Sequence, residues 1–231
     1  MIEVFRYQTE EGKEPLTEWP QSLRDKQAQA KIRVRLKRLE AGNFGDCDPV
    51  GKGVQELREH LGAGYRVYFG RHGQTVVILL CGGSKRWGSQ GWAALSPNSQ
   101  IATGRYQNCQ EILGRLEEEA SMSKKLKAAV SHYDREVAEL RADRELAVEY
   151  LKAAMESLDN PDDRAAGLLA LRTVAEAYGG LGAVAAEAGI SRESLYRTLS
   201  AKGNPTLKTL LAVLKAVGMK LSVEPDQHAA A

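Results

Sequence analysis

Residues 54–81, VQELREHLGAGYRVYFGRHGQTVVILLC, decide the fold class of the N-terminal half of this chain. They contain runs rich in β-branched and aromatic residues, separated by the turn-forming segments Gly62-Ala63-Gly64 and Arg71-His72-Gly73. An antiparallel meander is therefore predicted. Its last strand contains the unbroken apolar run VVILL, which predicts a central strand buried on both faces. The predicted strands cover residues 54–59, 64–70 and 74–81.

The segment before this meander predicts one more strand and a long helix. Residues 2–7 alternate as a half-buried strand does, and Pro15 and Pro20 bracket a short helical turn. A helix is predicted over residues 23–39, ended by the glycine-containing segment 41–43. A strand, a helix and three further strands describe a compact α+β domain.

The predicted helix at 23–39 carries a dense set of positive charges. Phosphates of a nucleic acid would pair with such a helix face, and Lys31, Arg35 and Arg38 are the candidate RNA contacts. The alternative is a solvated helix face that binds nothing. The cations on this helix are Lys31, Arg33, Arg35, Lys37 and Arg38.

The composition is that of a globular protein with room for two domains. The chain has 231 residues, of which 43% are hydrophobic and 27% charged. No apolar run approaches the roughly 20 residues that cross a bilayer, and the N-terminus is polar, so we expect a cytoplasmic protein without a membrane partner. Cys47, Cys81 and Cys109 lack the close spacing of a zinc site, so neither a metal nor a cofactor is expected.

Charge is divided unevenly along the chain. Residues 1–86 hold 15 Lys and Arg against 11 Asp and Glu, whereas the remaining residues hold 17 against 19. The basic half suggests a polyanionic partner. The acidic half is a candidate for covering that basic half within the same molecule.

Composition changes abruptly at Trp87. The segment 87–99, WGSQGWAALSPNS, has no charge and is rich in Gly, Ser and Asn, which is typical of a loop or inserted linker. A helical pattern resumes over residues 100–120, and almost everything after Met122 is predicted to be helical. The predicted helices there cover residues 131–158, 162–178, 181–188, 191–200 and 206–217.

Residues 181–203, LGAVAAEAGISRESLYRTLSAKG, have the spacing of a DNA-reading helix-turn-helix. Ala185 is small where the two helices would cross, Gly189 provides a left-handed turn, and Leu195 would be buried. One such unit reads few bases, so a homodimer on a two-fold operator is expected. The alternative is a plain three-helix packing unit. The predicted DNA contacts are Ser191, Arg192, Glu193, Ser194, Tyr196, Arg197 and Lys202.

Four sequence blocks in the first half occur together in one known family. They are AGNFGD at 41–46, ELR at 56–58, GYRVYF at 64–69 and LLCGGSKR at 79–86. On these blocks residues 1–86 resemble the HigB-type toxins of the RelE superfamily, the phage-derived addiction module killer group. The resemblance implies an antiparallel sheet with packed helices, whose concave face holds RNA.

The second half resembles the partner antitoxins of that group. Residues 170–223, from ALRTVAEAYGG to GMKLSV, are similar to HigA-type proteins with a helix-turn-helix. Toxin and antitoxin are normally two products of one operon, and here both lie in one chain in the same order. The expected division is a toxin-like α+β core at 1–86, an inserted loop with a displaced helix at 87–121, an all-helical antitoxin-like domain at 122–225, and a disordered tail at 226–231.

The resemblance implies ribosome-dependent cleavage of messenger RNA, with Arg58, Arg66, Tyr68, Lys85 and Arg86 as the catalytic residues. The residue types suit that chemistry, because arginines clamp phosphate oxygens and a tyrosine can stack on a base or relay a proton. Lys85 would act as a base only if its surroundings lowered its pKa. The inserted segment after Arg86 leaves the geometry of this last pair open.

Two functions follow, and they belong to different classes. The first is a latent endoribonuclease held inactive by its antitoxin half, which also binds operator DNA and represses transcription. The second is a DNA-binding repressor that carries a catalytically dead toxin relic. The toxin–antitoxin contact could form within one chain or by a swap between two chains. A small-molecule sensor has little support, since Gly82-Gly83 is too short for a nucleotide loop.

Overall fold

The computed structural model describes residues 2–62, 64–84, 109–115 and 129–222. The predicted catalytic pair Lys85 and Arg86, the inserted segment that follows them, and the tail at 226–231 lie outside the described residues. Of the helix predicted over 100–120, residues 109–115 are described, and they are helical.

The N-terminal half is built on a mixed sheet with the strand order β2-β3-β4-β5-β1-β6. The meander of β3, β4 and β5 is antiparallel, as predicted. The sheet is not antiparallel throughout, because β1 pairs in parallel with β5 after the chain crosses over through two helices. The strands are β1 (Glu3–Tyr7), β2 (Cys47–Gly51), β3 (Val54–Glu59), β4 (Tyr65–His72), β5 (Val76–Ser84) and β6 (Ala129–Ser131).

Strand β5 is the central strand that its apolar run predicts. It lies between β4 and β1, and residues 77–81 are all buried. β2 was not predicted, since its sequence CDPVG has no apolar alternation. Pairing with β3 is what makes this segment a strand.

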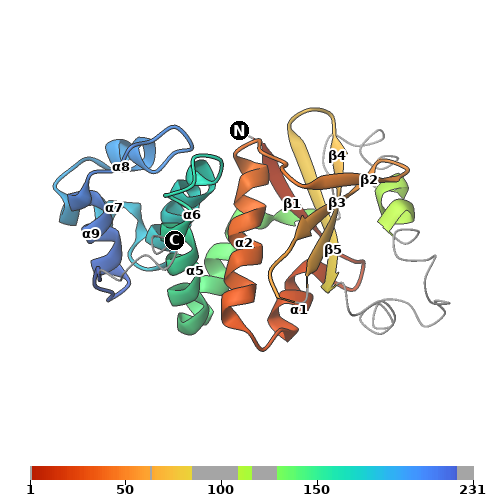
Figure 1. Cartoon of the computed structure of the whole chain (residues 1–231), viewed down its shortest axis with the longest axis horizontal. Helices are drawn as coiled ribbons and strands as arrows, with labels where there is room; N and C mark the ends of the chain where they lie inside the picture. The colour runs from red at the N-terminus through yellow and green to blue at the C-terminus, as the bar shows by residue number, and fades with distance from the viewer. Residues whose placement is uncertain (1, 63, 85–108, 116–128, 223–231) are drawn as a thin grey trace, which may run out of the picture.

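Helices cover both faces of the sheet. Helices α1 (Pro15–Ser22) and α2 (Lys26–Glu40) pack on one face, and the helical segment 109–115 packs on the other (Figure 1). Glycines allow close approach on each side: a Cβ on Gly82 would lie 2.1 Å from the ring of Trp19, and one on Gly70 would lie 2.3 Å from Leu113. Gly82 therefore serves the packing of α1 on β5.

The C-terminal half is helical, as predicted, apart from the short strand β6 and one interruption. The helix predicted over 131–158 is interrupted at Asp143, which is extended (φ −128°, ψ 97°) and caps the following helix by accepting from the Leu146 N–H. Asp143 also pairs with Lys26 of the N-terminal half, so a tertiary contact accompanies the break. The helices are α4 (His132–Ala142), α5 (Arg144–Glu156), α6 (Arg164–Ala177), α7 (Gly180–Ala188), α8 (Arg192–Thr198) and α9 (Leu207–Ala216).

The two halves share a core. Helix α2 lies between the sheet and helices α5 and α6 (Figure 1). Its residues Ala30 and Val34 belong to the same apolar cluster as Leu140, Tyr150 and the interior of the C-terminal helices. Among the described residues, no helix is long and apolar enough to span a bilayer.

Candidate functional site

One candidate site lies on the sheet face opposite α1 and α2. Arg58 of β3 and Arg66 of β4 are directly paired across the two strands, and Tyr68 follows two residues later on the same face. Glu56 of β3 pairs with Tyr68 in the same register. The meander therefore brings three of the predicted catalytic residues together.

Glu56 is the residue on which this group converges. Its Oε1 accepts a hydrogen bond from Arg58 Nε at 3.0 Å and pairs with Arg66 Nε at 3.2 Å. Its Oε2 accepts from the Tyr68 hydroxyl at 2.9 Å. Both guanidinium groups are thus held at one carboxylate oxygen through Nε, while Arg58 Nη2 pairs with Asp48 and Arg66 Nη1 donates to the Tyr65 carbonyl.

Acidic groups surround Arg58 and change the expected electrostatics of this face. Arg58 pairs with Asp48, lies 3.8 Å from Asp46, and bonds Glu56. Two guanidinium groups thus face three carboxylates among the described residues, so that part of the face is not the cationic cleft that the charge of residues 1–86 suggests. A phosphate bound here would have to displace carboxylates.

A second, larger site is the junction between the two halves, which we call the seam. Strand β6 adds an antiparallel edge strand to β1, with Ser131 opposite Phe5 and Val130 opposite Arg6. Helix α4 continues directly from β6, and α5 and α6 then pack on α2. The C-terminal half therefore binds the N-terminal half both as a strand and as a helical layer.

Glu139 of α4 binds two arginines of the N-terminal half. It forms an ion pair with Arg6 of β1, and its Oε2 accepts from Arg33 Nε at 3.1 Å. Arg6 also donates to Thr17 Oγ1 at 2.7 Å. Burial raises the pKa of Glu139, but the two guanidinium groups outweigh it and hold the pKa below its usual value. Glu139 is therefore a buried carboxylate whose charged form is favoured by Arg6 and Arg33.

Lys37 is buried completely between two carboxylates from opposite halves. Its Nζ lies 2.8 Å from Glu40 Oε1 and 2.6 Å from Glu136 Oε2. Burial lowers the pKa of Lys37, but the two carboxylates reverse this and raise it overall. Glu136 Oε1 also accepts from the Tyr150 hydroxyl at 3.1 Å. The Lys37 ammonium group therefore links α2 to α4 across the seam.

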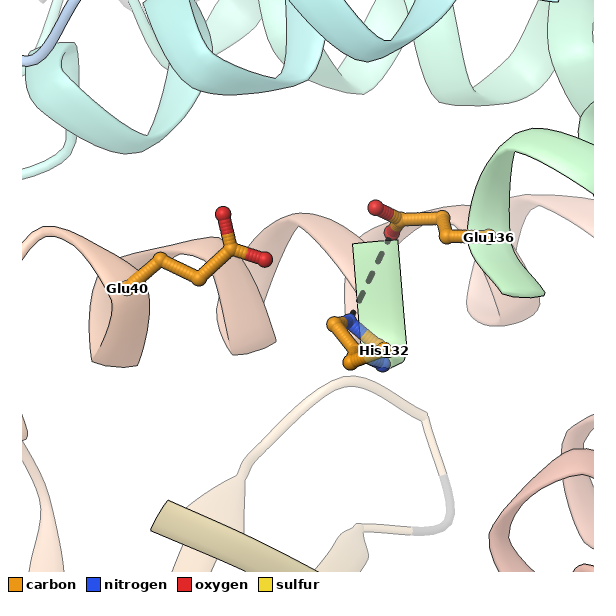
Figure 2. A group of neighbouring side chains, drawn as sticks. All are labelled: Glu40, His132 and Glu136. Atoms are coloured by element: carbon orange, nitrogen blue, oxygen red, sulfur yellow. Dashed lines mark ion pairs between the residues drawn. The ribbon is translucent and has the colours of Figure 1, made fainter. Parts of the chain in front are cut away.

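His132 lies beside two of these carboxylates, those of Glu40 and Glu136 (Figure 2). Its Nδ1 accepts from Arg6 Nε at 2.9 Å, so the neutral ring carries its proton on Nε2, which is 3.9 Å from Glu136 Oε1. Burial and the neighbouring Arg6 lower the pKa of His132 well below its usual value. Ligand atoms of Glu40, His132 and Glu136 lie within 4.8 Å of one another, a spacing that would suit a metal ion. The Lys37 ammonium already supplies the positive charge that these carboxylates need.

Further ion pairs form the edge of the seam. Lys26 pairs with Asp143 at 2.5 Å, Lys31 pairs with Glu156 at 3.4 Å, and Arg38 pairs with Asp163. Of the cations on α2, Arg33, Arg35 and Lys37 are buried, so the solvated or RNA-facing helix is not what the folded chain presents. Lys31, Arg35 and Arg38, the predicted RNA contacts, face α5 and the segment that leads into α6 instead.

The turn between α7 and α8 contains the left-handed glycine and the helix cap that the sequence predicts. Gly189 ends α7 in the left-handed conformation (φ 70°), and the Ser191 hydroxyl caps α8 by accepting from the Ser194 N–H at 3.1 Å. Ala185 and Leu195 are buried. Of the predicted DNA contacts, Ser194 is half-buried and the others, Ser191, Arg192, Glu193, Tyr196, Arg197 and Lys202, are exposed.

Sequence reasoning missed Arg6, His132 and Glu56 as site residues. Arg6 carried a signal, because it occupies the same strand face as buried Val4. Glu56 alternates with Arg58 on β3 and so had to share its face. His132 gave no sign, since its hydrogen-bond partner Arg6 lies 126 residues earlier in the chain.

Fold and seam together define a class of protein: a domain with a mixed sheet, whose strand β1 and cationic helix α2 are covered by strand β6 and a helical region. Comparison with known sequences matches residues 130–225 to the family described as probable addiction module antidote protein. The chain belongs to this antidote family through its C-terminal region. Such a family implies a toxin partner and supports a place in a toxin–antitoxin system.

Two relatives, both called uncharacterized proteins, come from Haemophilus influenzae. One is 51% identical over 67 residues, which cover 29% of this chain and 68% of the relative. The other is 46% identical over 46 residues, which cover 20% of this chain and 47% of the relative. No solved structure matches the chain.

Proposed function

We propose that this chain is a toxin and its antidote in one polypeptide. The N-terminal α/β domain is a RelE-like, HigB-type messenger RNA endoribonuclease, and the antidote region holds it inactive in the cytoplasm. The observation that carries the proposal is the seam, where an antidote-family strand and helix bury Glu136 and Glu139 against Lys37, Arg6 and Arg33. An antidote region bound this tightly to the domain beside it has its toxin partner in the same chain.

The strand face supports the nuclease half of the proposal. Arg58 and Arg66 would hold the scissile phosphate, and Tyr68 would stack on a base or carry a proton. The 2′-oxygen attacks phosphorus, the bond to the 5′-oxygen breaks, and Lys85 and Arg86 are proposed to complete the site. Glu56 must first release the guanidinium groups to the phosphate, because it binds both.

Inhibition would act through the seam rather than by covering the arginine face. The described helices of the antidote region pack on α2 and β1, which lie on the opposite face and at the edge of the sheet. RNA contact by Lys31, Arg35 and Arg38 would require the seam to open. A seam formed between two chains, by exchange of antidote regions, would bury the same groups.

Loss of one arginine should abolish toxicity. Expression of residues 1–120 alone should arrest growth, and co-expression of residues 122–231 should restore it. Arg66→Ala in the short fragment should slow RNA cleavage by about 10²–10³-fold, as removal of one donor to a developing oxyanion does. Ribosome-dependent cleavage of a reporter messenger RNA measures this directly.

The control for that experiment is Arg71→Ala. Arg71 is exposed on the same strand, but on the other face, where it lies 4.6 Å from the ring of Phe44. Its replacement should leave cleavage unchanged. A folded 1–120 fragment that neither arrests growth nor cleaves RNA would contradict the nuclease assignment.

We further propose that α7 and α8 form a DNA-reading helix-turn-helix that represses the operon of this chain as a homodimer. The support is the left-handed Gly189, the capped α8 and the exposed Arg192 and Arg197. Helix α8 has seven residues and reaches few bases, so two copies on a two-fold operator are needed.

Arg192→Ala should weaken operator binding by roughly 5–150-fold, the loss of about 1–3 kcal/mol expected for one base-contacting arginine. Gel-shift titration with the DNA upstream of the gene measures the effect. Arg24→Ala, an exposed arginine remote in sequence from this unit, should bind like the parent. Equal affinity of Arg192→Ala and Arg24→Ala for the operator would show that Arg192 does not contact the DNA.

A second function has one specific observation in its favour. Asp46, Asp48 and Glu56 neutralise Arg58, which suits a toxin relic that no longer grips phosphate. The chain would then be a DNA-binding repressor without nuclease activity. Operator binding together with an inert 1–120 fragment is the result that this alternative predicts.

A further inference from the structure

A cavity of about 270 Å³ lies between the two halves, on the far side of α2 from the sheet's arginine site. One wall is formed by Lys31, Arg35 and Arg38, which succeed one another on one face of α2. The opposite wall comes from the antidote region, through Glu156 at the end of α5 and the segment that leads into α6. Neither half makes this cavity without the other.

Arg35 is the least compensated cation of this cavity. Only 6% of it is exposed, and its Nη1 has no hydrogen-bond partner among the described residues. Its Nη2 donates to the Phe44 carbonyl at 2.7 Å, and Cys47 is a neighbour, but no carboxylate lies within ion-pair distance among the residues described. A buried guanidinium group without an anionic partner is costly.

A second guanidinium group increases the positive charge beside Arg35. Arg35 Nη2 and Arg38 Nη1 lie 2.9 and 3.6 Å from the same point, the position of a Cβ on Gly45. Burial lowers the pKa of Arg35, and the charge of Arg38 lowers it further. Asp163 forms an ion pair with Arg38, and both Asp163 and Glu59, which line the cavity, attract Arg35 from a greater distance.

We propose that this cavity binds a small phosphate-type oxyanion, held by Arg35 and Arg38 with Lys31 at its mouth. Planar guanidinium groups match the oxygens of a phosphate, and Lys31 is partly exposed and held only by a long pair with Glu156. The volume is just below the ~300 Å³ at which pockets for drug-sized ligands begin, which suits inorganic phosphate or one phosphorylated metabolite. The carboxylates of Glu59, Glu156 and Asp163, which also line the cavity, limit the ligand to one compact anionic group.

The anion would tighten the seam. Because both halves line the cavity, a ligand that binds the closed arrangement and not the open one stabilises the closed one by RT ln(1 + c/Kd), where c is the free ligand concentration. Phosphate would then strengthen the hold of the antidote region. This inference depends on the cavity alone and stands whether or not the N-terminal domain cleaves RNA.

Thermal unfolding of the full chain tests the proposal, with inorganic phosphate as the probe and sodium chloride at equal ionic strength as the reference. Phosphate at ten times its Kd should raise Tm by about 3–6 °C above chloride. Arg35→Gln should raise the Kd measured by calorimetry at least tenfold, and Arg24→Gln, an exposed arginine outside the cavity, should not. Parallel titrations with pyrophosphate and a nucleoside 5′-monophosphate identify which source of phosphate binds best.

Equal Tm values in phosphate and chloride would overturn the proposal. So would equal phosphate affinity in the parent chain and Arg35→Gln, since the anion would then bind elsewhere. If Arg35→Gln does not fold, Arg35→Lys replaces it, because lysine keeps the charge but lacks the planar guanidinium group that binds two oxygens at once. A Kd for phosphate raised several-fold in this variant supports the site, and an unchanged Kd refutes it.

Discussion

Glu139→Gln should lower the free energy of unfolding of the full chain by about 3–5 kcal/mol, the cost of removing one partner of a buried ion pair. The substitution keeps the shape of the side chain and removes its charge, so Arg6 and Arg33 would stay buried without an anion. Urea denaturation measures the change. The loss should appear first as separation of the two halves, because Glu139 connects α4 to β1 and α2.

The matched control is Glu149→Gln. Glu149 is on the adjacent helix of the antidote region and pairs with Lys152, whose side chain is 55% exposed, so its replacement should cost less than about 1 kcal/mol. A loss of similar size for both variants would mean that the seam is no more than a set of surface pairs.

The same carboxylate contributes to acid sensitivity. The pKa of Glu139 is lower in the folded chain than in the unfolded one, so its contribution is present above about pH 4.5 and is lost as pH falls through the folded value. Glu139→Gln should therefore reduce the dependence of stability on pH in that acidic range.

His132→Asn should remove a second pH dependence, at higher pH. The pKa of His132 is lowered well below its usual 6.5 by burial and by Arg6. Below about pH 6.5 the unfolded chain therefore binds a proton at His132 that the folded chain does not bind. The free energy of unfolding must then fall as pH decreases from 6.5, by up to roughly 1.4 kcal/mol per pH unit. Protonation of His132 at Nδ1 would also remove the hydrogen bond that this atom accepts from Arg6 Nε.

Asparagine suits this test because its Oδ1 can accept from Arg6 as Nδ1 does, but it does not titrate. Stability of the parent chain should fall between pH 6.5 and 5, whereas His132→Asn should give a flatter profile. Glu136, whose pKa burial raises, acts in the opposite direction and is present in both proteins. His72→Asn, at an exposed position, should keep the slope of the parent. If stability depended on pH equally in His132→Asn and in the parent, His132 would not be the group that causes this pH dependence.

If both results hold, acid weakens the seam in two steps, first through His132 and then through Glu139. The antidote region would detach before the N-terminal sheet loses its own core, since the sheet has a separate apolar cluster that includes Phe69 and Leu79. Under the proposed function, such detachment frees the toxin half.

Much of the architecture was predictable from local patterns. The antiparallel meander followed from alternation and glycine turns, and the buried β5 followed from five apolar residues in a row. The α7–α8 turn followed from Gly189 and Ser191. A shared site for Arg58, Arg66 and Tyr68 was expected from the resemblance alone, and the structure places these three on one face of the sheet.

The sequence by itself determined these elements because strand alternation, helix capping and turn chemistry depend on residues within a few positions of one another. Only the tertiary structure decided which partners the cations on α2 have. Arg33 binds Glu139, which lies 106 residues away in the sequence, and Lys37 pairs with carboxylates of both halves. The sequence of a cationic helix does not reveal whether the helix faces water, RNA or carboxylates. Burial selects among these, since a charge removed from water must find its partner inside the fold.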